Sequence, residues 1–336
     1  MNKTINSILN HISFFVLLFL FSFISCKSPT APKNTFPPGN RDYTWTADTI
    51  NNPFLLFYNI WGSSPSNVWT TGSLMSDGVY HYNGQNWSLD NRVYISDPDA
   101  VWGYNNSLWI GNDHGCIWKF TDSSYTEELS NFNVNGKFVD FVGMKGTSNN
   151  EIYAVGYNYT NPVIMRYDGN SWQLDKTLSD TSIFNQIVYC YSNDKYYIVS
   201  ALNNYTTKIY EYDRKNLKLI YTYPVSNAGP TIASIDGYPY IVAGNKIYMY
   251  LNRIMVFIFE VDDPNFGGVI WGRNRNDIIM MMQDGIAEYN GSDWKYLIKS
   301  AEAYVSPHSA IFEKDVFIPA KIRSTGISII YHGTLK

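Results

Sequence analysis

The feature of this sequence that most constrains its fold is an internal repeat with a period of about 40 residues. Three segments follow the same plan, and they cover residues 60–87, 142–172 and 270–294. Each begins with an apolar residue and Gly, continues through a polar turn into an apolar strand, and ends in Tyr-Asn/Asp-Gly-x-x-Trp. A repeated unit of this kind buries its apolar faces by stacking on its neighbours. The chain is therefore expected to form an array of similar units.

Within one unit the pattern predicts four antiparallel strands. The first strand ends at Trp61-Gly62, where we expect Gly to permit the backbone geometry of a turn. The second covers residues 68–71, and the third covers residues 79–82. Asn83-Gly84 then supplies a strong hairpin signal, and Trp87 opens a fourth, outer strand. The high aromatic content of 17% also favours strands.

The spacing of the units gives their number. Trp61 and Trp102 lie 41 residues apart, Val142 follows 40 residues later, and Trp271 lies 129 residues beyond Val142, or three steps averaging 43. Periods of about 40–45 residues with four strands per unit are typical of β-propellers. Weaker copies are expected at residues 187–191, 231–235 and 309–312. The chain is therefore expected to contain seven repeat units.

The two ends of the repeat region are complementary. The seventh copy has strands at residues 310–312, 316–319 and 327–331 but lacks a fourth. An orphan strand at residues 43–46 precedes the first full copy. We predict that this N-terminal strand completes the last blade, because joining the ends leaves no large open sheet edge. The predicted fold is an all-β, seven-bladed β-propeller of four-stranded antiparallel blades over residues 42–336.

These units resemble those of kelch-like or galactose-oxidase-like propellers found in exported bacterial lipoproteins. The resemblance covers residues 42–336 and implies the fold. The double Gly of kelch second strands, the Asp box of sialidases and the WD40 signature are all absent from the sequence. No functional residue is therefore carried over from these families.

Residues 1–25 have the organisation of a lipoprotein signal peptide. Lys3 precedes an apolar run over residues 14–24, which is too short to span a bilayer as a helix. The sequence Phe23-Ile24-Ser25-Cys26 resembles a bacterial lipobox, which implies cleavage before Cys26 and lipid attachment to its sulfur. Ordinary cleavage after Ser25 is the alternative, although Phe23 is large for such a site.

The segment from residue 26 to residue 41 has the composition of a tether. It contains four prolines and almost no apolar residue, so it is expected to be extended and unable to form a core. We expect the protein to be anchored to the membrane through Cys26. Lys27 stands where Asp signals retention in the inner membrane in lipoproteins of this kind, so the outer membrane is favoured.

The sequence contains no signature of a reaction. Metal-ligand His spacings, a G-x-S-x-G elbow and a phosphate loop are absent, and neither a metal nor a cofactor is expected. Asp97-Pro98-Asp99 and residues 262–265 are interpreted as solvated turns, because neither offers the oxygen set of a calcium loop. A net charge of −4 argues against nucleic acid as a partner.

Cys116 and Cys190 are expected to be small buried hydrophobes, with a disulfide between them as the alternative.

Ligands of propellers usually bind at the channel mouth, on loops joining the second and third strands and on loops between blades. Amides beside aromatic rings, as in Tyr157-Asn158-Tyr159, suit sugars, although exposed Tyr and Asn are also frequent in any aromatic-rich β-protein. Trp61, Trp102 and Trp271 are repeat residues and are expected in the core. The candidate ligand-binding residues are Asp113, His114, Tyr157, Tyr159, Tyr205, Phe266, Tyr304 and Arg323.

The expected function is that of a cell-envelope binding or scaffold module, monomeric and non-catalytic, whose partners are proteins or glycans. The alternative is a secreted propeller enzyme acting on glycans, which requires carboxylates or a His–Tyr pair at the channel mouth. The six apolar residues 254–259 form an unusual outer strand. Either neighbouring structure covers this strand, or it is an exposed patch for a partner.

Overall fold

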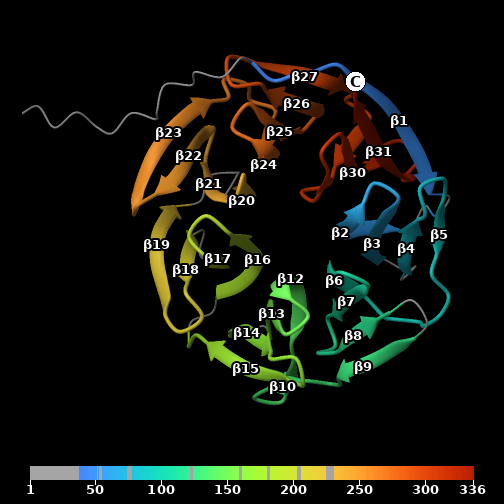
Figure 1. The fold of residues 1–336 in the computed structure, drawn as a ribbon, viewed down its shortest axis with the longest axis vertical. Coiled ribbons are helices and arrows are strands. Elements are labelled where there is room, and N and C mark those ends of the chain that lie inside the picture. The colour runs from blue at the N-terminus through green and yellow to red at the C-terminus, as the bar shows by residue number, and fades with distance from the viewer. Residues whose placement is uncertain are drawn as a thin grey trace, which may run out of the picture. The chain divides into compact units, whose positions relative to one another are not determined.

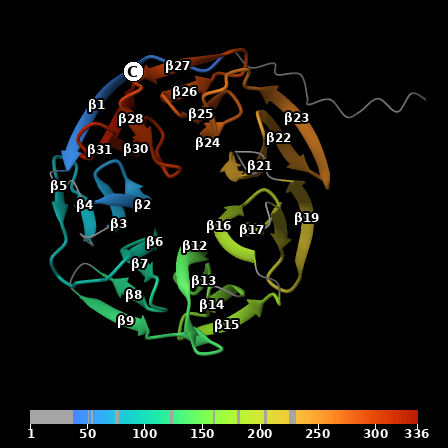
Figure 2. The same ribbon diagram turned by 180° about the vertical axis from the view of Figure 1, so that it is seen from behind.

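The protein forms a ring of β-sheets around a central channel (Figures 1 and 2). The structure, a computed structural model, describes residues 38–336 except 51, 53–54, 74–77, 122–123, 159–160, 180–181, 203–205 and 225–230. All regular secondary structure in these residues is β-strand. The same residues contain no helix with the length and apolar character needed to cross a membrane.

Each blade is an antiparallel meander whose first strand lines the channel and whose last strand lies on the outside of the ring. Blade one contains β2 (Leu56–Ser64), β3 (Asn67–Ser73), β4 (Gly78–Tyr82) and β5 (Trp87–Leu89). Blade two contains β6 (Pro98–Tyr104), β7 (Ser107–Asn112), β8 (Ile117–Phe120) and β9 (Tyr125–Leu129). A hairpin follows, made of β10 (Asn133–Val134) and β11 (Lys137–Phe138). Blade three contains β12 (Asp140–Ser148), β13 (Glu151–Tyr157), β14 (Pro162–Tyr167) and β15 (Trp172–Thr177).

The second half of the ring follows the same plan. Blade four contains β16 (Ser182–Cys190), β17 (Lys195–Leu202), β18 (Thr206–Tyr212) and β19 (Leu217–Pro224). Blade five contains β20 (Thr231–Ile235), β21 (Tyr238–Ala243), β22 (Lys246–Leu251) and β23 (Ile254–Glu260). Blade six contains β24 (Phe266–Asn274), β25 (Asp277–Met282), β26 (Gly285–Tyr289) and β27 (Trp294–Lys299). Together with blade seven, which is described next, these sheets make the seven blades that the sequence predicts.

Blade seven closes the ring with both ends of the chain, as predicted. Its strands are β28 (Ala303–Val305), β29 (Ala310–Ile311), β30 (Asp315–Ile322), β31 (Ser328–Leu335) and β1 (Tyr43–Ile50). The N-terminal strand β1 pairs with β31 along its whole length, from Tyr43 opposite Leu335 to Ile50 opposite Ser328. The inner strand is divided, because β28 and β29 pair with different parts of β30 and residues 306–309 leave the sheet between them.

The repeated Gly at the end of the inner strand permits a close backbone approach at the turn, as predicted. A β-carbon on Gly62, Gly103, Gly146 or Gly272 would lie 2.5–2.9 Å from the carbonyl oxygen of the first residue of the facing second strand, although none of the four adopts a positive φ. In blades two and three the Gly also makes room for an aromatic ring from the preceding blade. A β-carbon on Gly103 would lie 2.5 Å from the ring of Trp61, and one on Gly146 would lie 2.7 Å from the ring of Trp102.

The Tyr-Asn/Asp-Gly-x-x-Trp motif forms the hairpin between third and fourth strands. The side-chain oxygen of Asn83 accepts hydrogen bonds from the backbone N–H groups of Gln85 and Asn86, both at 2.9 Å. Gly84 adopts a φ of +93°, which favours Gly. Equivalent side-chain caps are formed by Asp168, Asp213 and Asn290. The predicted hairpin is confirmed, and its Asn or Asp is the residue that caps it.

The cores lie between adjacent blades. In β25 the predicted double-sided burial is found, since Ile278, Ile279 and Met280 are fully buried. Trp102 is buried as expected, whereas Trp61 and Trp271 are half-buried. Trp61 and Trp271 both pack against core clusters, as predicted, but the ring of Trp271 also borders the central cavity.

Cys116 and Cys190 are both buried and unpaired. Burial raises the pKa of the Cys190 thiol to about 12, so it stays protonated and unreactive. The interpretation of these residues as small core hydrophobes is confirmed, and the disulfide alternative is wrong.

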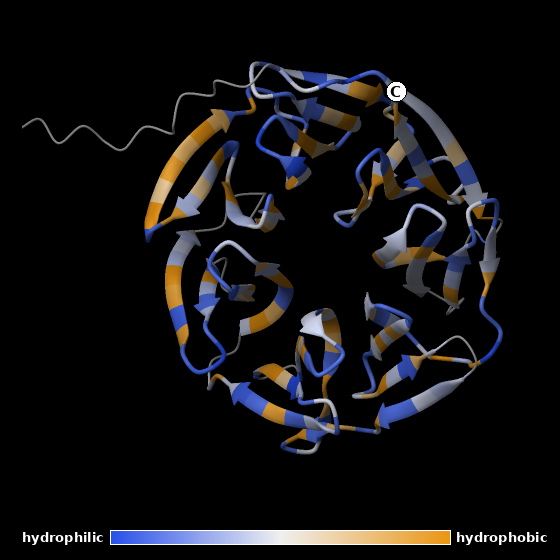
Figure 3. Ribbon diagram, in the orientation of Figure 1, coloured by the Kyte–Doolittle hydropathy of each residue, from blue (hydrophilic) through white to orange (hydrophobic). Residues whose placement is uncertain are grey.

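The outer strand β23 is largely apolar (Figure 3), and its residues are partly buried and partly exposed. Phe259 is buried and stacks on Tyr289 of blade six with ring centroids 3.8 Å apart. Phe257 and Ile254 remain exposed, by 47% and 46%. A register irregularity between β22 and β23 changes the side of the strand on which successive residues fall. Neighbouring structure therefore covers part of this strand, as one expectation held, and the rest of it is exposed, as the other held.

Candidate functional site

The ring has two chemically different ends. We call the end with the turns between second and third strands, and the connections between blades, the mouth face. The opposite end, with the turns between first and second strands, is the base face. The described chain begins on the base face, where the Gly39 N–H donates to the carbonyl of Asn290 at 2.9 Å.

Carboxylates gather on the mouth face over blades two and three. Asp97 and Asp99 lie at the entry to β6, Asp113 lies in the β7–β8 turn, and Asp140 begins β12. We call these four residues, together with His114, Tyr58 and Tyr157, the acidic mouth. The pKa of Tyr58 is raised, first by burial and then by the charges of these four carboxyls, which shows that all four lie near its hydroxyl.

Asn112 holds the two loops of the acidic mouth together. It is 3% exposed, and its side-chain oxygen accepts from the backbone N–H groups of His114 at 3.1 Å and Cys116 at 2.9 Å. Its Nδ2 donates to the carbonyl of Ser96 at 3.1 Å. Next to this bond Asp97 has a φ of +44°, an uncommon backbone conformation for a residue other than Gly. The loop is thus held in a strained form that places Asp97 beside the β7–β8 turn.

Asp99 and Asp140 form a carboxyl pair joined by a hydrogen bond. Burial, followed by the charge of Asp140, raises the pKa of Asp99 to about 9. Burial also raises the pKa of Asp140, while a hydrogen bond from Tyr157 opposes that shift. The Oδ1 atom of each Asp is buried and has no hydrogen-bond partner. Two carboxyls this close share one proton, so the pair retains a neutral carboxyl at pH 7.

Asp113 forms the outer part of the acidic mouth. Its carboxylate is hydrogen-bonded to Nδ1 of the half-exposed His114, and burial together with the charge of Asp97 raises its pKa. One ligand atom from each of Asp97, Asp113 and His114 lies within 4.8 Å of the others. Two carboxylates and an imidazole are a donor set that suits a divalent transition metal with open positions for water. Sequence spacing does not reveal this set, since its residues come from two loops.

The structure brings three of the predicted ligand-binding residues, Asp113, His114 and Tyr157, into the acidic mouth. Phe266 does not belong to it, because its side chain is only 8% exposed and packs in the core between blades five and six. Phe266 was predicted to lie in a loop at the mouth, but it is the first residue of β24. Side chains of an inner strand alternate between the channel and the core, and that of Phe266 points to the core.

Tyr304 and Arg323 lie together on a different part of the mouth face. The Arg323 guanidinium lies 5.8 Å from the centroid of the half-exposed Tyr304 ring. Arg323 also donates to the carbonyl of Gln283 at 3.0 Å. Tyr304 and Tyr58 line a small cavity of about 160 Å³ between blades seven and one. The predicted residues Tyr159 and Tyr205 lie outside the described part of the chain.

The sequence prediction missed Tyr58, Asp99 and Asp140 as site residues, although a signal was present. Each stands two residues before the apolar residue that opens a repeat, at Ile60, Val101 and Val142. Superimposing the repeats would have placed the three side chains at equivalent positions of successive blades, where they meet around the channel.

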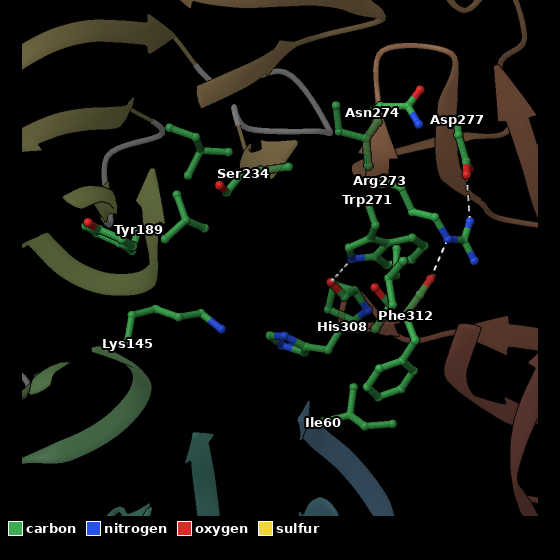
Figure 4. Close-up of a pocket in the computed structure, with 18 of the residues that line it drawn as sticks. Ile60, Lys145, Tyr189, Ser234, Trp271, Arg273, Asn274, Asp277, His308 and Phe312 are labelled. Atoms are coloured by element: carbon green, nitrogen blue, oxygen red, sulfur yellow. Dashed lines mark hydrogen bonds and ion pairs between the residues drawn. The ribbon is translucent and has the colours of Figure 1, made fainter. Parts of the chain in front are cut away.

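A second site feature, the central cavity, has a volume of about 960 Å³ and extends to the base face. It is lined by the inner strands and contains Lys145, His308 and Trp271 (Figure 4). The mouth of the channel therefore carries carboxyls, whereas the cavity within it carries the Lys145 amine.

Comparison with known proteins identifies the fold and no family. No protein-family model matches the sequence, and no curated protein is significantly similar to it. Among solved structures, a catalytically inactive virginiamycin B lyase from Staphylococcus aureus with quinupristin has a TM-score of 0.68 at 14% identity, covering 88% of this chain and 100% of that one. YCF48 bound to D1 peptide has a TM-score of 0.63 at 14% identity, covering 91% and 99%. Oligogalacturonate lyase in complex with manganese has a TM-score of 0.60 at 10% identity, covering 92% and 96%.

Proposed function

We propose that this protein is an exported, lipid-anchored protein of the cell envelope whose propeller binds a basic segment of a partner protein at the acidic mouth, without catalysing a reaction. The observation that carries the proposal is the cluster of four carboxyls on one rim of the channel. Nothing described in that cluster supplies a Lys or Arg counter-ion to Asp99 or Asp140, and one oxygen of each is buried without a partner.

The electrostatics of the cluster favour a cationic partner. Burial, and after it the charges of neighbouring carboxyls, raises the pKa values of Asp99, Asp113 and Asp140, so ionising all of these groups is unfavourable in the free protein. A Lys or Arg side chain entering the mouth would relieve this repulsion and form charge-assisted hydrogen bonds. A propeller of the same fold, YCF48, has been solved bound to a peptide, which is consistent with this use of the architecture.

The position of the N-terminal segment supports a binding role at an envelope surface. The described chain enters on the base face, and Asn40 Nδ2 donates to the Lys336 carbonyl at 3.0 Å there. The acidic mouth lies at the opposite end of the strands from Asn40, so the entering chain leaves it open to a partner.

Action on glycans is the second candidate, and the neutral carboxyl of the Asp99–Asp140 pair favours it, because a protonated carboxyl can serve as a general acid. Oligogalacturonate lyase in complex with manganese shows that a propeller of this fold can act on a glycan. Against this, the two carboxyls are in hydrogen-bond contact, whereas glycosidase carboxyls stand about 5 Å or more apart. The pair alone therefore does not have hydrolase geometry.

A binding experiment with matched variants separates the candidates. Full-length protein in detergent is titrated with a hexalysine peptide, and the Asp97→Asn/Asp113→Asn variant is expected to bind at least about tenfold more weakly. The control is Asp262→Asn/Glu313→Gln, which removes the same charge from exposed positions outside the mouth. Equal affinity of the two variants for hexalysine would refute the proposal. A glycan-array signal that Asp99→Asn abolishes, without peptide binding, would instead favour the second candidate.

A further inference from the structure

The central cavity has the dimensions of a small-molecule site. Its volume of about 960 Å³ lies within the usual range of ligand pockets, about 300–1,000 Å³. Its wall combines apolar side chains with a few polar groups, including Tyr189 and Ser234. The cavity is separate from the acidic mouth, whose carboxyls do not line it.

Lys145 is the cation of this cavity. It projects from β12 across the channel towards blade seven (Figure 4). No hydrogen bond or ion pair links its amine to any residue that the structure describes. The surrounding protein desolvates the amine and lowers the pKa of Lys145. An ammonium group held in such a cavity without a counter-ion is costly, and an anion would remove that cost.

His308 faces Lys145 from the opposite side (Figure 4). It lies in residues 306–309, which interrupt the inner strand of blade seven, and this break is fixed by a 2.8 Å bond from the Ser306 N–H to the Pro319 carbonyl. Burial and the charge of Lys145 lower the pKa of His308 to about 4. The imidazole is therefore neutral at pH 7 and has one N–H to donate.

Two other charged groups of the cavity, Arg273 and Asp277, pair with each other. Arg273 Nη1 lies 2.7 Å from an Asp277 oxygen and 2.8 Å from the Tyr43 hydroxyl, and its Nε donates to the Phe312 carbonyl. Asp277 is thus the counter-ion of Arg273 and not of Lys145. Glu313 is exposed at the base-face rim.

We propose that the central cavity binds a small organic acid, whose carboxylate lies between Lys145 and His308 and whose apolar part contacts Trp271, Ile60 and Phe312. The amine and imidazole N–H supply charge-assisted hydrogen bonds to the carboxylate. The Trp271 ring is fixed for such a contact, because its Nε1 donates to the Pro307 carbonyl at 3.3 Å. This site is independent of the partner-binding role of the acidic mouth.

The test compares acids with neutral analogues of the same shape. Equilibrium dialysis of full-length protein in detergent is carried out with phenylacetate against phenylacetamide, and with glucuronate against glucose. At least one acid is expected to bind about tenfold or more tightly than its neutral analogue. Binding of phenylacetate identifies an aromatic acid as the preferred chemistry, and binding of glucuronate identifies an acidic sugar.

Variants assign the binding to the cavity. Lys145→Met is expected to weaken binding of the acid about tenfold or more, while Lys145→Arg keeps the charge and retains binding. The control Lys246→Met removes an exposed amine outside the cavity and is expected to have no effect. The proposal is refuted if neither acid binds, if acid and neutral analogue bind equally, or if Lys145→Met binds like the parent. A thermal melt of Lys145→Met establishes that the variant is folded.

Discussion

Replacing Asp99 by Asn should stabilise the protein while impairing its acidic mouth. Asp99 is held with a pKa of about 9 in the folded protein, whereas an unfolded chain ionises Asp at about 3.9. Above pH 4 the unfolded state therefore loses a proton that the folded state keeps. Stability must fall as the pH rises from about 4 to about 9, by up to about 1.4 kcal/mol per pH unit. Asn cannot titrate, and its N–H can still donate to Asp140.

The size of the effect follows from this slope. Between pH 4 and pH 7 the full proton linkage amounts to about 4 kcal/mol. Asp140 shares the proton and Asp99 keeps some contact with solvent, so we expect about half of this, or about 2 kcal/mol, to be recovered by Asn at pH 7. For a chain of this size that corresponds to a rise in Tm of about 4 °C.

The assay is thermal and urea unfolding of the parent and Asp99→Asn at pH 4.5, 6 and 7.5. The stability difference should be small at pH 4.5 and should grow with pH. Asp262→Asn, at an exposed position, is the control and should change stability by less than about 0.5 kcal/mol at each pH. A difference that is constant with pH, or a loss of stability at pH 7.5, would show that Asp99 is ionised in the folded protein and that the reasoning is wrong.

Three further predictions concern other parts of the chain. Gly146→Ala should destabilise the fold by about 1–3 kcal/mol, measured by urea unfolding, because its β-carbon would press on the Trp102 ring. Glu288→Gln should stabilise the fold increasingly from pH 5 to pH 8, because burial and Asp277 raise the pKa of Glu288 to about 8, so the parent loses stability as pH rises through this range. Cys26→Ala should abolish lipid attachment, seen as loss of the acyl mass and release from the membrane fraction.

The fold could be predicted because its signals recur in every unit. The Asn-Gly turn at residues 83–84 and the unpaired N-terminal strand at residues 43–46 each point to one arrangement, and both occur in the structure. The role of the repeated Gly could be predicted only in part. The close approach of the facing carbonyl belongs to the turn, whereas the ring of Trp61 on Gly103 is a contact between blades that local turn chemistry does not encode.

The sequence predicted three residues of the acidic mouth, Asp113, His114 and Tyr157, but not the carboxyl pair at its centre. Asp113 and His114 are adjacent in sequence and were identified together. The Asp99–Asp140 pair joins residues 41 positions apart, and its raised pKa values arise from burial that appears only when blades two and three meet. His308 enters the cavity because the inner strand of blade seven is interrupted, and the repeat pattern gives no sign of that interruption.

The opposite charges of the mouth and the cavity persist because the fold keeps them apart. Asp140 and Lys145 both belong to β12, and five residues of extended strand separate them by about 16 Å. This exceeds the screening length of about 8 Å at physiological ionic strength, so neither charge neutralises the other through solvent. The register of β12 therefore places a carboxyl without a basic partner at one end of the strand and the Lys145 amine in its middle. The two proposals, a mouth that binds a cationic partner and a cavity that binds an anion, both depend on this separation.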